Sequence, residues 1–196
     1  MKKFVLLSLC FLLTTVIAVA QPPAKTATIA GELNNQLRGA EGEFVGAADA
    51  MPEDKYGFAP TSGEFKGVRT FALQVKHVAT VNYIIAQSIS GEKPPVDIGK
   101  SENGPDSLTA KADIIKYLKD SFAFLHKAMG TITPANATKD IAMPFDPSGK
   151  TRTTPLGMAV IGVSHPFDHY GQMVEYLRMN GIIPPASRPR PNAAGQ

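Results

Sequence analysis

The sequence predicts an all-α protein, a four-helix bundle preceded by a cleaved signal peptide. Four stretches carry apolar residues at steps of three or four, the spacing of a helix with one buried face, and no convincing strand run lies between them. A chain of 196 residues has the size of one domain. The helical stretches cover about residues 29–51, 64–90, 109–129 and 154–180. The expected division is a signal peptide (1–20), a bundle domain (21–186) and a Pro-rich tail (187–196).

The first twenty residues have the features of a secretory signal. Lys2 and Lys3 precede a run that is almost wholly apolar, and the small residues that end at Ala20 suit cleavage before Gln21. A retained membrane anchor is the alternative, but the run is only as long as a signal core, and no second one follows. A lipoprotein is less favoured, because Cys10 lies in the middle of the run. We expect an exported protein, periplasmic or secreted, with no stable membrane association after cleavage.

Composition argues against several kinds of function. Cys10 is the only cysteine, so the mature chain can form neither a disulfide nor a thiolate site. Loss of Lys2 and Lys3 on cleavage lowers the formal net charge from +3 to +1. The basic residues are scattered, apart from two arginines in the Pro-rich tail, which we expect to be disordered. Nucleic-acid binding is therefore not expected.

The first predicted helix is weak by itself and needs packing to hold it. Four glycines interrupt it, and each costs up to about 1 kcal/mol relative to alanine. Pro52 ends the helix, and a loop follows. Its apolar positions are Ile29, Leu33, Leu37, Ala40, Phe44, Ala47 and Met51.

The second predicted helix, from about Glu64 to Ser90, has the strongest pattern and should be mostly buried. Gly91 closes it, followed by two prolines. One broad face carries Phe71, Val75, Val78, Ile85 and Ile89. The opposite, polar face carries Arg69, Lys76, Thr80 and Gln87.

The third predicted helix has Thr109 as its expected N-cap and ends at Gly130. Its buried seam is Ile114, Leu118, Phe122 and Leu125. The next segment, residues 131–152, is rich in Pro, Gly, Asp and Thr, which predicts a loop with a short hairpin around residues 146–149.

The fourth predicted helix begins at Thr154 and Pro155, a cap residue followed by a proline at the first helical position. It runs to Asn180 and Gly181. Pro166 lies inside it without an N–H to donate, so we expect a kink or a late start there.

Two histidines on the fourth predicted helix are spaced to bind one metal ion. His165 and His169 are four residues apart, so they lie about 6 Å apart along the axis and about 40° apart around it. A third ligand from another helix would complete a set with open positions for water or substrate. We take His77 for that role, because it is mid-helix on the best-packed helix. His126, near the end of the third helix, is expected at the surface.

Other interpretations of these histidines remain open. If no metal is bound, His77 would be a core residue whose ring nitrogens are hydrogen-bonded, and the other two would lie at a helix interface. The segment between His165 and His169 also resembles the H-x-x-E-H pattern of zinc proteases, but with Asp168 in place of the glutamate and a proline inside it. No acidic residue is forced into the site by spacing, since Asp168 and Glu175 point roughly 60° to 120° away around the helix.

Several runs of sequence resemble a known family. They are Met51–Tyr56 leading to Pro60-Thr61, then Val75–Ala79, and above all His165–Gln172 followed by Glu175–Arg178 and Gly181–Pro185. On these residues the chain resembles the DinB-like (DinB/YfiT-like) superfamily of four-helix bundles, over about residues 28–186. The resemblance implies helices that do not follow a simple up-down order and frequent homodimerisation.

The resemblance also implies a divalent metal, with zinc or nickel foremost, held by residues that match His77, His165 and His169. Some characterised members of the superfamily are thiol transferases or isomerases, and many have no known activity. Pro166 is a departure that could affect the site, because a kink at this proline would displace His165 and remove one ligand.

Three functions follow from these observations. The first is an exported protein that binds a divalent metal through three histidines and acts as a metal-dependent transferase or hydrolase on a small molecule. The second is a non-catalytic metal- or ligand-binding protein of the cell envelope. The third is a structural protein without metal, in which replacing all three histidines by glutamine would leave thermal stability unchanged with or without zinc.

Overall fold

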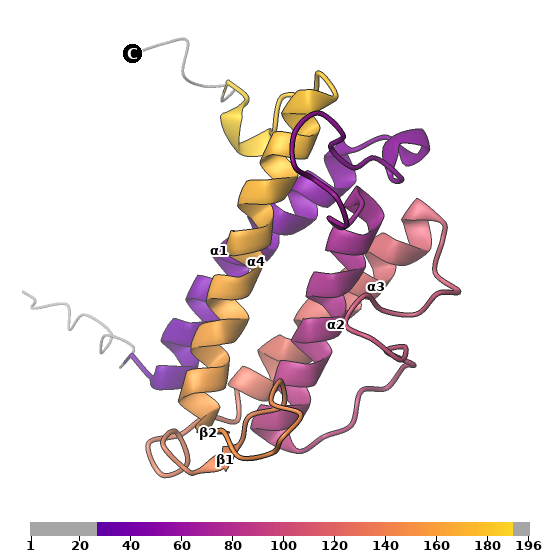
Figure 1. Ribbon diagram of the computed structural model, residues 1–196. Helices are drawn as coiled ribbons and strands as arrows, with labels where there is room; N and C mark the ends of the chain where they lie inside the picture. Colours follow the sequence, from indigo (N-terminus) through magenta and orange to yellow (C-terminus); the bar gives the residue numbers. More distant parts are fainter. Residues whose placement is uncertain (1–26, 190–196) are drawn as a thin grey trace, which may run out of the picture.

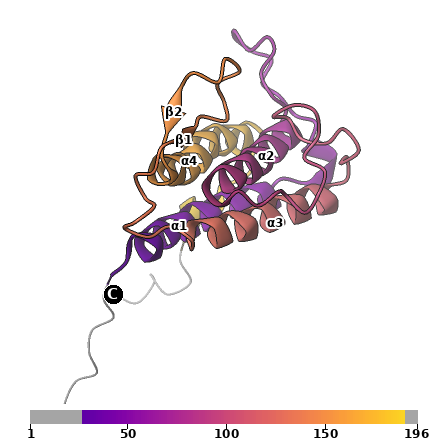
Figure 2. The ribbon, with the colours of Figure 1, turned by 90° about the horizontal axis from the view of Figure 1, so that it is seen from below.

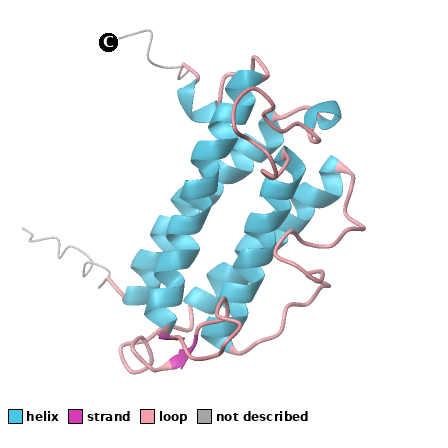
Figure 3. Cartoon of the chain, in the orientation of Figure 1, coloured by secondary structure: helices cyan, strands magenta, loops and turns pink. Residues whose placement is uncertain are grey.

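The computed structural model describes residues 27–189, and these residues are mostly helical, with four long helices, as the sequence predicts (Figure 1, Figure 3). The predicted signal peptide, its cleavage site and tail residues 190–196 lie outside the described residues. The helices are α1 (Ile29–Ala50), α2 (Phe71–Ser90), α3 (Lys111–Met129) and α4 (Pro155–Met179). The short elements are the 3-10 helices η1 (Glu53–Lys55) and η2 (Pro185–Ser187) and the strands β1 (Ile141–Ala142) and β2 (Arg152–Thr153). In this described part, no helix has the length and apolar character needed to cross a membrane.

The helices do not follow one another around the bundle. α1 packs against α4 and α3, and α2 packs against α3 and α4. Seen end-on, α1 is therefore diagonal to α2, and α3 is diagonal to α4 (Figure 2). α2 and α3 both start at the end of the bundle where α1 stops, so these neighbours run in the same direction (Figure 1). The connection 91–110 must consequently run back along the whole length of α2.

All four helices contribute to one apolar core. The predicted apolar seams are buried, and a small residue in α4 lets the helices approach closely. A side chain at Gly162 would meet Met129 at 3.0 Å, Leu125 at 3.3 Å and Ile85 at 3.5 Å. Side chains from α2 and from the diagonal helix α3 therefore fill the space beside Gly162, one turn before His165. The largest fully buried side chains include Leu37, Phe44, Phe71, Tyr83, Ile85, Ile114, Leu118, Phe122, Leu125 and Met158.

The expected start of the second helix at about residue 64 was wrong, because α2 begins at Phe71. Gly63 and Gly67 have φ angles of +117° and +82°, which are incompatible with a right-handed helix. Thr70 caps the helix instead, and its hydroxyl accepts a hydrogen bond from the Leu73 amide at 3.3 Å. Residues 64–70 therefore form a loop over the end of the bundle.

The middle of the polar face of α2, at Lys76 and Thr80, is buried because the connection 91–110 covers it. Lys76 and Thr80 are only 5% and 1% exposed. The Lys76 ammonium donates hydrogen bonds to the carbonyls of Pro105 and Leu108 at 2.9 and 3.3 Å. Gly104 lies so close that a side chain there would meet Thr80 Oγ1 at 3.0 Å. The connection is thus fixed along α2, where it brings backbone and side-chain groups next to His77.

The start of α3 also differs from the prediction. Ala110, not Thr109, is the N-cap, and it offers no side-chain hydrogen bond. A carboxylate from η1 takes over, since the Lys111 amide donates to Glu53 Oε1 at 3.3 Å. α3 ends at Met129, next to Gly130, as predicted.

The predicted hairpin is present between α3 and α4. β1 and β2 pair antiparallel, with Ile141 opposite Thr153. The Asp146 carboxylate holds the turn by accepting hydrogen bonds from the amides of Ser148 and Thr151 at 2.8 and 2.6 Å. A hydrogen bond from the Ser148 hydroxyl at 2.6 Å, together with these amide bonds, holds the pKa of Asp146 well below its usual range. The hairpin delivers Phe145 to the histidine site described below.

α4 begins as predicted and continues through its internal proline. The Thr154 hydroxyl accepts a hydrogen bond from the Gly157 amide at 3.0 Å, with Pro155 in the first turn. The helix is unbroken across Pro166, so the late start considered for this position is wrong.

Candidate metal site

Three histidine rings converge between α2 and α4. His77 Nε2 and His165 Nε2 are 3.2 Å apart, and one ring nitrogen from each of His77, His165 and His169 lies within 4.8 Å of the others. The ring centroids are 4.5 to 5.0 Å apart. Pro166 does not displace His165 from this cluster. The structure thus brings together the three histidines that the sequence singles out.

Two of the three rings are oriented by protein acceptors. His77 Nδ1 donates to the backbone carbonyl of Glu102 at 2.9 Å, and His169 Nδ1 donates to Gln74 Oε1 at 2.7 Å. Gln74 is itself fixed, because its Nε2 donates to Gln172 Oε1 at 2.8 Å. In both rings Nε2 is therefore the unprotonated nitrogen, which is the arrangement that metal-binding histidines adopt.

His165 lacks such a partner. Its Nδ1 is buried and has no hydrogen-bond partner among the described residues. Its Nε2 instead faces His77 Nε2. His165 is held by packing against the other two rings. Hydrogen bonds therefore fix the orientation of His77 and His169 but not that of His165.

Burial lowers the pKa of all three imidazoles. At His165, burial, the nearby rings of His169 and His77, and Arg69 lower the pKa to about 3. At His169, burial and then His77 lower the pKa to about 4. The pKa of His77 is lowered by burial and by Arg69, against the opposing hydrogen bond to Glu102. All three rings are therefore neutral at pH 7, the form in which imidazole binds metals.

The spacing of the nitrogens fits a metal ion. Two imidazole nitrogens bound at the usual length to one metal are separated by about 2.9 to 3.4 Å, from a right angle to a tetrahedral one. The 3.2 Å between His77 Nε2 and His165 Nε2 falls in this interval. The same separation suits a hydrogen bond between the two rings when one Nε2 carries a proton. The donor set is three neutral imidazoles, which suits zinc and nickel.

One cavity is lined by rings of the cluster, and a second lies on the far side of Gln74. The first, of about 210 Å³, is lined by His77 and His165, by the Glu102 side chain and by apolar groups that include Phe145. Glu102 Oε2 lies 3.9 Å from His77 Nδ1. The other cavity, of about 370 Å³, is lined by Gln74, the residue that orients His169. The site is therefore accessible to small molecules.

Comparison with known proteins identifies the family. The sequence profile of the DinB superfamily matches residues 36–173, which is most of the chain. This chain belongs to the DinB superfamily. No curated protein sequence matches it.

Two solved structures resemble this DinB superfamily member. A DinB-like protein from Bacillus cereus is 16% identical with a TM-score of 0.62, and the match covers 81% of this chain and 96% of that one. A DinB-like protein from Bacillus subtilis is 15% identical with a TM-score of 0.57, and the match covers 76% of this chain and 92% of that one. At such identities the likeness establishes the fold.

The fourth histidine of this DinB superfamily member, His126, lies away from the cluster and links two helices through side-chain contacts. His126 is half-buried between α3 and α1, and its Nδ1 and Nε2 contact Asn34 Oδ1 and Glu41 Oε2 at 2.5 and 3.1 Å. The expectation of a surface position was therefore too simple, but the choice of His77 over His126 agrees with the geometry.

The acidic residues near the cluster were only partly foreseen. Asp168 and Glu175 are exposed on α4 and line neither cavity, as their spacing predicts. Glu102 and Gln74 were missed. Glu102 lies in a connection without periodicity, so only its proximity in the fold reveals it, whereas Gln74 could have been noticed as a polar residue one turn from His77.

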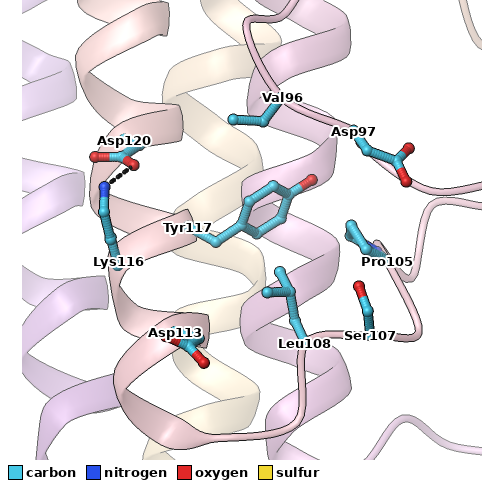
Figure 4. A pocket seen from close by; sticks show the side chains of 9 residues that line it. All are labelled: Val96, Asp97, Pro105, Ser107, Leu108, Asp113, Lys116, Tyr117 and Asp120. Carbon is cyan, nitrogen blue, oxygen red and sulfur yellow. Dashed lines mark hydrogen bonds and ion pairs between the residues drawn. The ribbon is translucent and has the colours of Figure 1, made fainter.

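A separate cavity of about 340 Å³ lies between α3 and the connection 91–110 (Figure 4). Tyr117 reaches across it, surrounded by Asp97, Asp113 and Asp120. The Tyr117 hydroxyl is already bonded to Thr80 Oγ1 at 2.9 Å, and Asp120 pairs with a lysine on its own helix. None of the histidines lines this cavity, so it is distinct from the candidate metal site.

Proposed function

We propose that this chain is an exported protein that binds one divalent metal ion, zinc or nickel, through His77, His165 and His169. In this proposal it uses the metal in a transferase or hydrolase reaction on a small molecule. The convergence of three neutral imidazoles within 4.8 Å is the observation that carries the proposal. The cavity of about 210 Å³, which two of the rings line, supports chemistry over a closed structural site.

The surrounding residues have separate tasks in this proposal. When bound, the metal would supply a Lewis acid that polarises a carbonyl or lowers the pKa of a water or thiol towards about 7. Glu102 lines the cavity and is half-exposed, so its carboxylate is placed to accept a proton from a bound molecule. The Glu102 carbonyl and Gln74 keep His77 and His169 in the tautomer with a free Nε2. Phe145, from the hairpin, contributes an apolar wall to the cavity.

Metal content tests the proposal directly. Protein purified without an affinity tag should contain, or take up on titration with zinc or nickel, about one metal ion per chain. The variant with all three histidines changed to glutamine should contain none, whereas His126→Gln should bind as the wild type does. Elemental analysis provides the measurement, and less than a tenth of an equivalent with no uptake would contradict the proposal.

Gln74→Ala should weaken metal binding without removing a ligand. The substitution leaves His169 Nδ1 without its acceptor, and loss of such an outer partner typically lowers metal affinity by about 10- to 100-fold. Zinc affinity measured by competition with a coloured chelator tests this. Gln87→Ala, at an exposed position of the same helix, is the matched control and should leave the affinity unchanged. Equal affinities for both variants would mean that Gln74 does not orient the site.

The exported location rests on residues 1–20 alone. Expression of the full chain in a bacterial host should give a mature protein in the periplasm or medium that begins at Gln21. A membrane-bound or cytoplasmic product that retains Met1 would count against export. It would not count against metal binding.

A further inference from the structure

A polar cavity of about 370 Å³ lies one side chain away from the histidine cluster. Gln74 belongs to both, since it lines the cavity and accepts the hydrogen bond from His169 Nδ1 at 2.7 Å. The lining residues are Gly67, Val68, Arg69, Gln74, Asn103 and Gln172. Four of these six are polar, and Arg69 is the one cation among them.

Arg69 is held in place from two directions. Its Nε donates to Asn103 Oδ1 at 2.7 Å, and its backbone carbonyl accepts a hydrogen bond from the Tyr176 hydroxyl at 3.1 Å. Tyr176 is buried in α4, and Asn103 lies in the connection that covers α2, so two distant parts of the chain hold the half-buried arginine. Little freedom remains to be lost when its guanidinium binds a partner.

The terminal nitrogens of Arg69 have no partner within the described part of the chain. None of the ion pairs found in residues 27–189 includes Arg69, and its only side-chain hydrogen bond comes from Nε. One lining residue contacts an exposed carboxylate, since Gln172 Nε2 donates a long hydrogen bond to Asp168 Oδ2 at 3.5 Å. A fixed guanidinium with an open fork is the usual protein receptor for a carboxylate.

The first amides of α2 do not provide a competing anion site. The Phe71 and Ala72 amides each donate to a backbone carbonyl at 2.8 Å, and the Leu73 amide donates to the Thr70 hydroxyl. Arg69 is therefore the group that makes this cavity attractive to anions. Its charge also reaches the cluster, since it helps to lower the pKa of each of the three histidines.

We infer that the Arg69 cavity is a binding site for the carboxylate group of a small molecule. The guanidinium is the ionic partner, and the amide side chains of Gln172 and Asn103 form the polar walls. A ligand seated here would have its other end directed past Gln74 to the histidines. This orientation of the ligand toward the histidines rests on the proposed function, and it implies that the substrate is a small carboxylic acid. The carboxylate site itself does not require a metal.

Titration with acetate tests the inference, with uncharged acetamide as the comparison. Nuclear magnetic resonance of the nitrogen-15-labelled chain would follow the Nε–H of Arg69 in metal-free and zinc-loaded protein at fixed ionic strength. The side-chain amide signals of Asn103 and Gln172, which line the same cavity, would be followed in the wild type and in the variants that lack Arg69. We expect a saturable shift of this signal with acetate in both forms and none with acetamide. Arg69→Gln should lower the acetate affinity at least about tenfold, and Arg69→Lys, which keeps the charge without the fork, should lower it less. Lys66→Gln, an exposed position in the same loop, should change nothing.

The outcomes separate the two proposals. Acetate binding that appears only with zinc and survives Arg69→Gln would place the carboxylate on the metal and overturn the inference. Equal losses in Arg69→Gln and Lys66→Gln, or no saturable shift of the Arg69 signal in wild-type protein, would also overturn it. Failure to take up zinc would count against the metal proposal alone, since the metal-free titration still tests the cavity.

Discussion

Saturating zinc should raise the melting temperature of the wild-type chain by about 8–16 °C over that of the metal-free protein. A ligand that binds only the folded state at a thousand times its dissociation constant adds about 4 kcal/mol of stability. For a chain of this size, each kcal/mol moves the midpoint by about 2–4 °C. The histidines come from α2 and α4, so the metal would fasten two helices that are far apart in sequence. Calorimetry with zinc and with a chelator measures the effect.

The variant with glutamine at positions 77, 165 and 169 should lose this dependence on zinc. His126→Gln is the matched control, because it also removes a half-buried histidine and its contacts to α1. We expect His126→Gln to melt at a lower temperature but to keep the full upward shift with zinc. An unchanged shift in the triple variant would locate zinc binding elsewhere. The absence of any shift in the wild type would leave the three rings as a neutral, hydrogen-bonded cluster.

Local sequence patterns predicted those features that depend on periodicity and end signals. The seam through Ile114, Leu118 and Phe122 is buried as expected, because spacing alone decides which helical residues share a face. Thr154 caps α4, because a cap needs only a hydroxyl and the amide three residues later. The proximity of His165 and His169 could also be predicted locally, since a spacing of four residues places two side chains on the same face of a helix.

The remaining features depend on how distant segments meet. The polar side of α2 looks like a solvent face, yet Lys76 is buried because the connection 91–110 returns along it. Glu102 and Asn103 reach the site through the same connection, whose course no periodic pattern encodes. The helix start at Phe71 was missed because Val68 continues the apolar pattern. The left-handed backbone conformation at Gly67 prevents the helix from extending to that residue. Sequence reasoning thus found the three converging histidines and missed most of the residues that orient or surround them.

The same connection supplies the second large effect that we expect, from Gly99→Ala. Gly99 has a φ of +79°, and an added Cβ would lie 2.6 Å from the Gly104 carbonyl carbon and 2.8 Å from the Pro105 nitrogen. These are backbone atoms, which cannot turn away as the end of a side chain can. The left-handed backbone costs alanine about 1–2 kcal/mol, and the overlap adds about 1–3 kcal/mol. The free energy of unfolding should therefore fall by about 3 kcal/mol, measured by urea denaturation.

Gly149→Ala is the matched control, because Gly149 has a φ of +67° but nothing within 4 Å of an added Cβ. It should show only the backbone cost of about 1–2 kcal/mol. The two variants should also differ at the site. Opening the connection at Gly99 moves the Glu102 carbonyl from His77 Nδ1, so Gly99→Ala should weaken zinc binding, whereas Gly149→Ala should not. Equal losses of stability and unchanged zinc affinity in both variants would show that the connection 91–110 neither crowds Gly99 nor orients His77.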